Sequence, residues 1–244
     1  MSRIHSSLQT PLDERVRTDA TPQGRFARPR LQTLVTWISV LGPLFVFGLL
    51  AEDVAERESF RFDTPLLLDL HTHSTPFFDA LMLALTWVGG VRLLAFSVLV
   101  MAFLWWRKQR FEALFLLSAM VGTSLLNISM KAAFGRARPN LWLSLTPEHD
   151  YGFPSGHSML SCTFVLAMLV LVWQSALSWT MKWLVAAVGI AFVSGVGLSR
   201  LYLGVHYPSD VLAGWSLSLA WVALLQGIFA RRLRHSSVER HSLV

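Results

Sequence analysis

The chain has 244 residues, of which 53% are hydrophobic and only 15% are charged, and it contains ten tryptophans. This composition is far more apolar than that of a typical soluble domain, so it excludes an ordinary soluble protein and predicts an integral membrane protein. The formal net charge of +6 does not indicate nucleic-acid binding, because that function requires a basic face on a soluble fold. Cys162 is the only cysteine, so neither an internal disulfide nor a cysteine-based metal cluster is expected.

The N-terminal part of the chain predicts a tail, a first span and an outer loop. Residues 1–30 are polar and rich in arginine, and we interpret them as a flexible basic tail. The first apolar run, Leu31 to Ala51, begins too deep for a cleaved signal peptide and has the roughly 20 residues that cross a bilayer. It is predicted as an uncleaved transmembrane helix. Residues 52–78 are rich in acids and are predicted to form an outer loop.

The next apolar run, Phe77 to Trp106, is too long for one straight span and is interrupted by two glycines and Arg92. We predict a short surface-lying helix that ends near Val88, followed by a span from Val91 to Trp106. This division allows Arg92 to reach the interface. The alternative is one long tilted helix in which Arg92 is buried.

Four more apolar runs complete the predicted membrane domain. They are Phe111 to Met130, His157 to Trp173, Lys182 to Leu198 and Pro208 to Ala230. The predicted fold class is therefore all-α, an integral membrane bundle of six transmembrane helices with a short extracytoplasmic interfacial helix, over residues 31–230. Residues 231–244 are predicted to form a second basic tail.

The distribution of basic residues predicts the orientation of the bundle. Fourteen of the 21 Lys and Arg residues fall on one side, and we assign that side to the cytoplasm because cytoplasmic segments are enriched in them. Both termini would then be cytoplasmic, in the cytoplasmic (inner) membrane of a bacterium. The outer side nevertheless carries Lys131, Arg136, Arg138 and Arg200 at the ends of spans. The rule that cations prefer the cytoplasmic side disfavours them there, so we expect that something other than membrane topology requires these cations at the span ends.

Three polar motifs fall on this outer side: Lys131 through Arg138 to Pro139, then the P-S-G-H sequence at 154–157, and then Ser199-Arg200 through His206 to Asp210. Their fixed cations suit a dense anion such as phosphate, because arginine binds phosphate oxygens in a bidentate manner and lysine adds a point charge. Snorkelling at helix ends would explain each cation alone. It does not explain the cations together with two histidines.

The P-S-G-H motif precedes an apolar helix, so backbone N–H groups near Gly156 should point out of its positive end and form an anion cradle. Ser155 can donate a further hydrogen bond. The alternative is ordinary N-capping by Ser155, which is compatible with anion binding.

The last motif places His206 four residues before Asp210, with Pro208 opening the final helix. The carboxylate can accept the N–H of one ring nitrogen and leave the other nitrogen free to attack phosphorus. His157 would then serve as general acid on the departing oxygen and activate water in a second step. Asp210 could instead only complement the helix dipole. We expect no metal and no other cofactor, because the surrounding cations would repel a divalent ion.

Read as K-x6-R-P, P-S-G-H and S-R-x5-H-x3-D, the three motifs together resemble the signature of the type 2 phosphatidic acid phosphatase (PAP2) superfamily, in its membrane-bound lipid phosphatase branch. The resemblance covers about Phe77 to Ala230. It implies a metal-independent phosphatase that acts through a phosphohistidine. By matching position, it implies His206 as nucleophile, Asp210 as its partner, His157 as acid and base, and Lys131, Arg138, Ser155, Gly156 and Arg200 as phosphate-binding residues.

The expected function is removal of phosphate from a lipid phosphate or diphosphate at the outer membrane face. The expected substrates are undecaprenyl diphosphate, phosphatidylglycerol phosphate, phosphatidic acid or diacylglycerol diphosphate. The alternatives are a phosphotransferase that passes the phosphoryl group to a second lipid, and a transporter or binding protein for a lipid headgroup. Membrane lipids are the expected partners, nucleic acid is not, and the sequence does not predict an oligomeric state.

Overall fold

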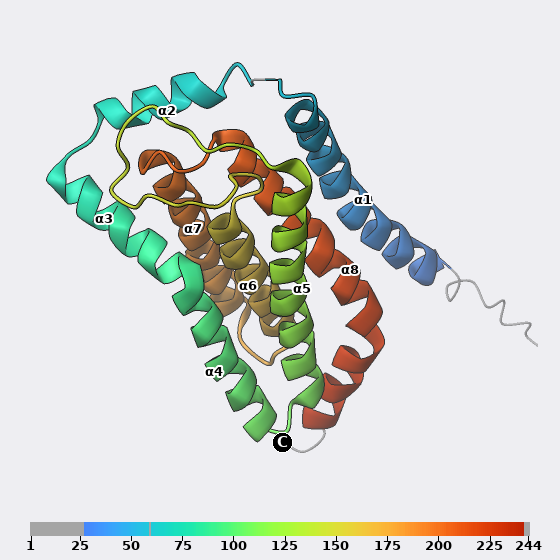
Figure 1. Ribbon diagram of the computed structural model, residues 1–244. Coiled ribbons are helices and arrows are strands. Elements are labelled where there is room, and N and C mark those ends of the chain that lie inside the picture. Colours follow the sequence, from blue (N-terminus) through green and yellow to red (C-terminus); the bar gives the residue numbers. More distant parts are fainter. Residues whose placement is uncertain (1–26, 59, 242–244) are drawn as a thin grey trace, which may run out of the picture.

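The computed structural model describes residues 27–58 and 60–241, so most of the predicted N-terminal tail and residues 242–244 lie outside the described residues. The helices are α1 (Ala27–Ala55), α2 (Asp63–Thr72), α3 (Pro76–Trp87), the π-helical segment η1 (Val88–Arg92), α4 (Leu93–Trp106), α5 (Arg110–Phe134), α6 (Gly156–Trp173), α7 (Trp179–Tyr202) and α8 (Pro208–His241) (Figure 1). No strand occurs in this part of the chain.

Six helical segments of the described chain are long and apolar enough to cross a membrane. They are Thr33–Ala55, Pro76–Trp106, Arg110–Phe134, Gly156–Trp173, Trp179–Tyr202 and Pro208–Ala230. The predicted all-α bundle of six membrane helices is therefore confirmed. The N-terminal end of α1 and the C-terminal end of α8 both lie away from the end of the bundle that carries α2 (Figure 1).

The predicted division of this run coincides with a kink in the structure. Segments α3, η1 and α4 follow one another without a loop over 31 residues, but two helices meet at Gly90, whose backbone angles of φ −94° and ψ −136° are not helical. The predicted boundary between Val88 and Val91 is therefore confirmed. The whole run is apolar enough to count as one candidate span, so the position of α3 at the membrane surface stays a prediction. Arg92 is exposed and lies 3.9 Å from the ring centroid of Trp87, so the alternative of one long helix with a buried Arg92 is wrong.

A further short helix, α2, lies outside the candidate spans and within the predicted outer loop. It lies across the end of the bundle (Figure 1). Two of its residues, Asp63 and Leu67, are buried against the helices below. The predicted outer loop is therefore partly helical, and one of its acids belongs to the interior.

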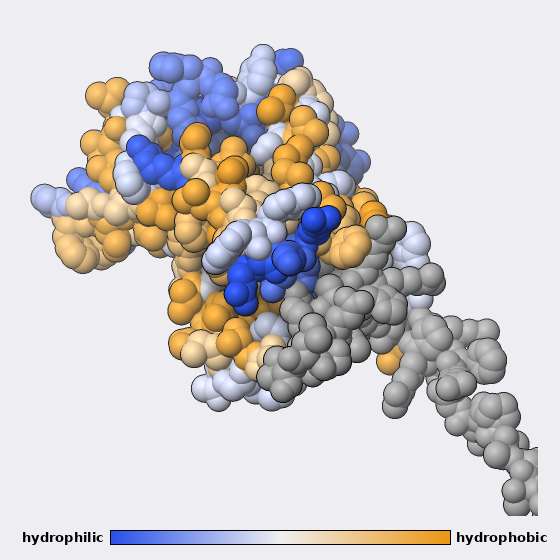
Figure 2. Space-filling view, turned by 90° about the horizontal axis from the view of Figure 1, so that it is seen from below, coloured by the Kyte–Doolittle hydropathy of each residue, from blue (hydrophilic) through white to orange (hydrophobic). Residues whose placement is uncertain are grey.

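Helix α6 lies at the centre of the bundle, where it packs against α5, α7 and α8, while α1 packs mainly on α8. A core between α5, α6 and α8 includes the fully buried Phe115, Leu116 and Ala167. The flanks are apolar and exposed, as lipid-facing surface would be. Seen from the end that carries the α4–α5 turn, a hydrophilic patch borders on apolar surface (Figure 2). The exposed residues of that turn include Arg107, Lys108 and Arg110.

Candidate active site

All three polar motifs meet at one end of the bundle. The helices α5 and α7 end there, α6 and α8 begin there, and the loop 135–155 crosses over them (Figure 1). Residues up to 146 positions apart in the sequence become neighbours at this end of the bundle. The prediction that the motifs share one side of the membrane domain agrees with this arrangement.

His206 and Asp210 form a buried pair at the start of α8. The turn before α8 depends on Gly204, which has φ +66° and leaves no room for a side chain beside Trp142. Nδ1 of His206 lies 3.4 Å from Oδ2 of Asp210, and the same oxygen accepts the backbone N–H of Tyr207 at 2.8 Å. Both side chains are at most 1% exposed.

The other ring nitrogen of His206 faces a cation. Nη1 of Arg138 lies 2.9 Å from Nε2 of His206 and donates to the carbonyl of Val205 at 2.7 Å. Because a guanidinium only donates, Nε2 acts as the acceptor and the ring proton is assigned to Nδ1, toward Asp210. Burial, together with the nearby Arg138 and Arg200, holds the pKa of His206 well below its ordinary value of 6.5. The imidazole is therefore neutral, with a lone pair on Nε2.

The P-S-G-H motif is held between α5 and α8. The backbone N–H of Ser155 donates to the carbonyl of Asp210 at 3.1 Å, and the amide of Asn127 donates to the carbonyl of Pro154 at 3.1 Å. The hydroxyl of Ser155 makes no capping bond to the helix and instead accepts from Ser158 at 3.0 Å. A Cβ at Gly156 would lie 3.1 Å from Oδ1 of Asn127. The motif is thus fixed from both sides.

Arg200 enters the site from the last turn of α7, and its side chain is 1% exposed. Its guanidinium donates to the hydroxyl of Thr86 on α3 and to the carboxylate of Glu148 in the loop. A buried guanidinium needs such partners, because an unsatisfied buried charge is costly. Thr86 therefore fixes Arg200 from outside the three sequence motifs.

Glu148 occupies the point on which the predicted site residues converge. Its carboxylate pairs with Arg200 and, at 2.6 Å, with Nη2 of Arg138. It also lies 4.0 Å from Nδ1 of His157 and 3.9 Å from Nε2 of His206. Burial raises the pKa of Glu148, but the charges of Arg200 and Arg138 outweigh this effect, so the pKa falls below its ordinary value of 4.5. An internal anion therefore holds the position that the sequence predicts for phosphate oxygens.

A second carboxylate, Asp150, pairs with the cations at the rim. It accepts from Nζ of Lys131 and, at 2.5 Å, from Nη2 of Arg138, while its backbone carbonyl accepts from Nε of Arg138 at 2.8 Å. Burial raises the pKa of Asp150, but hydrogen bonds from Lys131 and Arg138 outweigh this and lower it to about 2. Lys131 thus reaches the rim of the site through Asp150, whereas Arg138 contacts both acids and His206.

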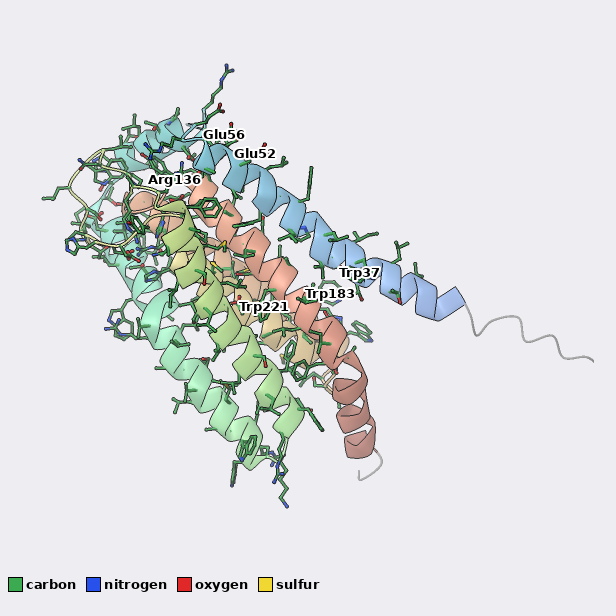
Figure 3. The ribbon with its side chains drawn as sticks, turned by 45° about the vertical axis from the view of Figure 1, so that its right-hand side comes forward. Trp37, Glu52, Glu56, Arg136, Trp183 and Trp221 are labelled. Carbon is green, nitrogen blue, oxygen red and sulfur yellow. The ribbon has the colours of Figure 1, made fainter. Side chains whose placement is uncertain are left out.

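Sequence reasoning gave no role to the pair formed by Asp63 and Arg136. Arg136 lies at the same end of the molecule as Glu52 and Glu56 of α1 (Figure 3). It donates to Asp210 through Nη1 at 2.5 Å and to Asp63 through Nη2 at 2.9 Å. Arg136 stood out only as a cation on the disfavoured side, and Asp63 only as one acid of the outer loop.

Metal-ligating side chains do not cluster in the part of the chain that the structure describes, where no group of three or more His, Cys, Asp or Glu is placed to hold an ion. The positive charge around Glu148 and Asp150 comes from Lys131, Arg138 and Arg200. A neutral imidazole beside a carboxylate, within a ring of cations at the end of a six-helix membrane bundle, suits phosphoryl chemistry. The fold and the site together define an integral membrane phosphatase.

The chain belongs to the PAP2 superfamily, whose family model matches residues 112–234. It is 34% identical over 155 residues to phosphatidylglycerophosphatase B of Bacillus subtilis (strain 168), which covers 62% of this chain and 75% of that protein. It is 35% identical over 133 residues to a lipid A 1-phosphatase of Rhizobium johnstonii, covering 48% of each chain. It is 34% identical over 92 residues to an undecaprenyl-diphosphatase of Sulfolobus acidocaldarius, covering 38% of this chain and 39% of that protein.

Two solved structures share the fold, and one of them is from the same family. The crystal structure of a transmembrane PAP2-type phosphatidylglycerolphosphate phosphatase from Bacillus subtilis superposes with a TM-score of 0.71 at 26% identity, over 80% of this chain and 97% of that one. The crystal structure of Aquifex aeolicus LpxE superposes with a TM-score of 0.57 at 23% identity, over 69% and 97% of the two chains, and supports the fold alone.

Proposed function

We propose that this membrane phosphatase hydrolyses lipid phosphates or diphosphates through a phosphohistidine on His206. The observation that carries the proposal is the geometry around that imidazole. Nδ1 of His206 lies 3.4 Å from Oδ2 of Asp210, and Nε2 lies 3.9 Å from the carboxylate of Glu148 among the cations. Burial and the neighbouring arginines lower the pKa of His206, which favours the neutral form that a nucleophile needs. A phosphoryl group in place of that carboxylate would present phosphorus to Nε2.

In the first step Nε2 of His206 bonds to phosphorus and the bond to the lipid oxygen breaks. His157 gives its proton to that leaving oxygen, which departs as an alcohol or as a lipid monophosphate. In the second step His157 takes a proton from water, the water oxygen bonds to phosphorus, and the bond to Nε2 breaks. Inorganic phosphate leaves and His206 is neutral again.

The cations stabilise the charge that develops on the phosphoryl oxygens. Arg138 and Arg200 already hold the carboxylate of Glu148 from two directions. The N–H groups at the start of α6, by Ser155 and Gly156, and the ammonium of Lys131 add to the positive potential. Each donor aimed at such charge is worth about 3–4 kcal/mol of the barrier, by analogy with single oxyanion-hole donors.

We assign the site to the outer face of the cytoplasmic (inner) membrane, with both termini cytoplasmic. Support comes from the exposed basic α4–α5 turn, which lies at the end of the bundle opposite the site. Residues 31–230 would form the catalytic unit, with basic tails at 1–30 and 231–244. The names of the relatives favour phosphatidylglycerol phosphate, undecaprenyl diphosphate and lipid A 1-phosphate as the first substrates to assay.

The test uses the full chain in lipid nanodiscs, with these three lipids and phosphatidic acid, in the presence of a chelator. The transferable phosphate of each lipid carries a radioactive label. We expect release of labelled inorganic phosphate. After a rapid alkaline quench, which preserves phosphohistidine, we expect part of the label on the protein. His206→Ala should lose both. His149→Ala, which changes an exposed histidine of the neighbouring loop, should keep both.

Full phosphate release by His206→Ala would overturn the proposal, as would activity that the chelator abolishes. A phosphorylated lipid acceptor without free phosphate would identify a phosphotransferase instead. Lipid binding without turnover would identify a binding or transport protein.

A further inference from the structure

A second layer of charge lies behind the His206–Asp210 pair, on the side away from Glu148. This layer includes Asp63, the first residue of α2, whose side chain is 4% exposed. Oδ1 of Asp63 accepts the backbone N–H of Ser209 at 3.0 Å, and Oδ2 accepts the hydroxyl of Ser209 at 2.5 Å. The start of α2 is therefore fixed to the start of α8, although the two residues are 146 positions apart in the sequence.

Arg136 joins this layer to the pair. Its Nη2 donates to Oδ2 of Asp63 at 2.9 Å, and its Nη1 donates to Oδ1 of Asp210 at 2.5 Å and to the hydroxyl of Ser209 at 2.7 Å. The guanidinium also lies 4.6 Å from the ring centroid of Tyr207. A planar fork held by two carboxylates and an aromatic face has little freedom to move.

The two oxygens of Asp210 therefore have separate partners. Oδ1 accepts from Arg136, while Oδ2 accepts the N–H of Tyr207 and faces Nδ1 of His206. Because a carboxylate is planar, fixing Oδ1 also fixes the direction of Oδ2. The direction of Oδ2 in turn sets the orientation and tautomer of the imidazole.

We propose that Arg136, held by Asp63 of α2, is a positioning residue that orients Asp210 and through it His206. The proposal rests on His206 being the nucleophile, as in the proposed function. The polar partners of Arg136 are Asp63, Ser209 and Asp210, and none of these contacts the position of Glu148. Arg136 should therefore affect the chemical step and leave the binding of the phosphoryl group nearly unchanged.

The test compares Arg136→Lys, Arg136→Gln and Asp63→Asn with Arg61→Gln, a matched control that removes an exposed arginine two residues before α2. Arg136→Gln leaves two buried carboxylates without their cation and destabilises the fold. Arg136→Lys keeps the charge but cannot bridge both carboxylates as a fork. The measurements are kcat, KM, inhibition by orthovanadate and the midpoint of thermal unfolding, all on the full chain in nanodiscs.

We expect Arg136→Lys to lower kcat by about 10-fold to 100-fold, by analogy with the loss of a partner that orients a metal ligand. KM and orthovanadate inhibition should stay within about twofold. Asp63→Asn should lower kcat in the same direction by a smaller factor, and Arg61→Gln should resemble the wild type. In an Asp210→Asn background, Arg136→Lys should cause no further loss of kcat, because the group through which it acts is already impaired.

Wild-type kcat in Arg136→Lys would overturn the inference, and so would a parallel loss of kcat and orthovanadate affinity, which a general structural role predicts. The variant His206→Ala distinguishes failure of the positioning role of Arg136 from failure of the proposed function. If His206→Ala is inactive while Arg136→Lys is fully active, only the positioning role is wrong. If His206→Ala is fully active, the proposed function itself is wrong.

Discussion

Replacing Gly90 with alanine is expected to slow the chemical step while leaving the bundle folded. Gly90 is buried at the kink between α3 and α4, and a Cβ at this position would lie 2.6 Å from Nε2 of His157 and 3.1 Å from its Cδ2. Ordinary contacts between such atoms need about 3.5–4.0 Å, so the imidazole has to move by about 1 Å. The side chain of His157 is 26% exposed and can move toward solvent, so the fold can accommodate the change.

A displacement of about 1 Å at a reacting group can cost about 100-fold in rate, which is about 2.7 kcal/mol of transition-state stabilisation. The assay is kcat at saturating lipid phosphate, together with orthovanadate inhibition and thermal unfolding. We expect Gly90→Ala to lower kcat by about 100-fold with an unfolding midpoint near that of the wild type.

Two glycines of the same chain serve as controls. A Cβ at Gly42 would meet no atom within 4 Å, so Gly42→Ala should change neither activity nor stability. A Cβ at Gly89 would lie 2.7 Å from both γ carbons of the fully buried Val196, so Gly89→Ala should lower the unfolding midpoint. Wild-type kcat in Gly90→Ala, or a loss of stability as large as that of Gly89→Ala, would refute the reasoning.

Two further predictions concern the acids of the loop. Glu148→Gln removes the charge that competes for Arg138 and Arg200, so orthovanadate should inhibit about 10-fold more strongly, and unchanged inhibition would contradict this reading of Glu148. The pKa of Asp150 is lowered from its ordinary value of 3.8 to about 2. The ion pairs of Asp150 therefore stabilise the folded loop fully at a pH above 3.8, and this stabilisation is lost as the pH falls through about 2. The effect should be small because the side chain of Asp150 is 58% exposed. The rates of hydrogen exchange of the loop in the wild type and in Asp150→Asn should differ above about pH 4 and converge near about pH 2. A difference that stays constant with pH would count against the pairing.

The sequence predicted a cluster of cations because, in the predicted orientation, they stand on the side where cations are disfavoured. Lys131, Arg138 and Arg200 could be recognised against that rule, and the apolar runs predicted five of the six spans within a few residues. The second span was predicted to begin at Val91, whereas the apolar helical stretch begins at Pro76. The anions that hold these cations gave no comparable signal. Glu148 is one acid in a polar loop, and its role depends on side chains that approach it from three other segments.

The break between α3 and α4 could also be predicted, because a Gly-Gly pair in an apolar run indicates a boundary between elements. The backbone does leave helical geometry at Gly90. The sequence does not show why the two glycines are required: a Cβ at Gly89 would lie against Val196, and a Cβ at Gly90 would lie against His157. Local sequence contains the glycines but not the neighbours that require them.

The site is built from two parts that differ in their freedom to move. Arg200, His206 and Asp210 are at most 1% exposed and lie at or between the ends of packed helices, whereas Glu148 is 25% exposed and belongs to the loop 135–155. In the proposed mechanism, a lipid phosphate has to displace Glu148 before its phosphorus can approach His206. Movement of the loop carboxylate requires less disruption of packing than movement of any helix end. We therefore expect Glu148→Gln to change the binding of anions to the site more than the rate of the chemical step, in contrast to Gly90→Ala and Arg136→Lys.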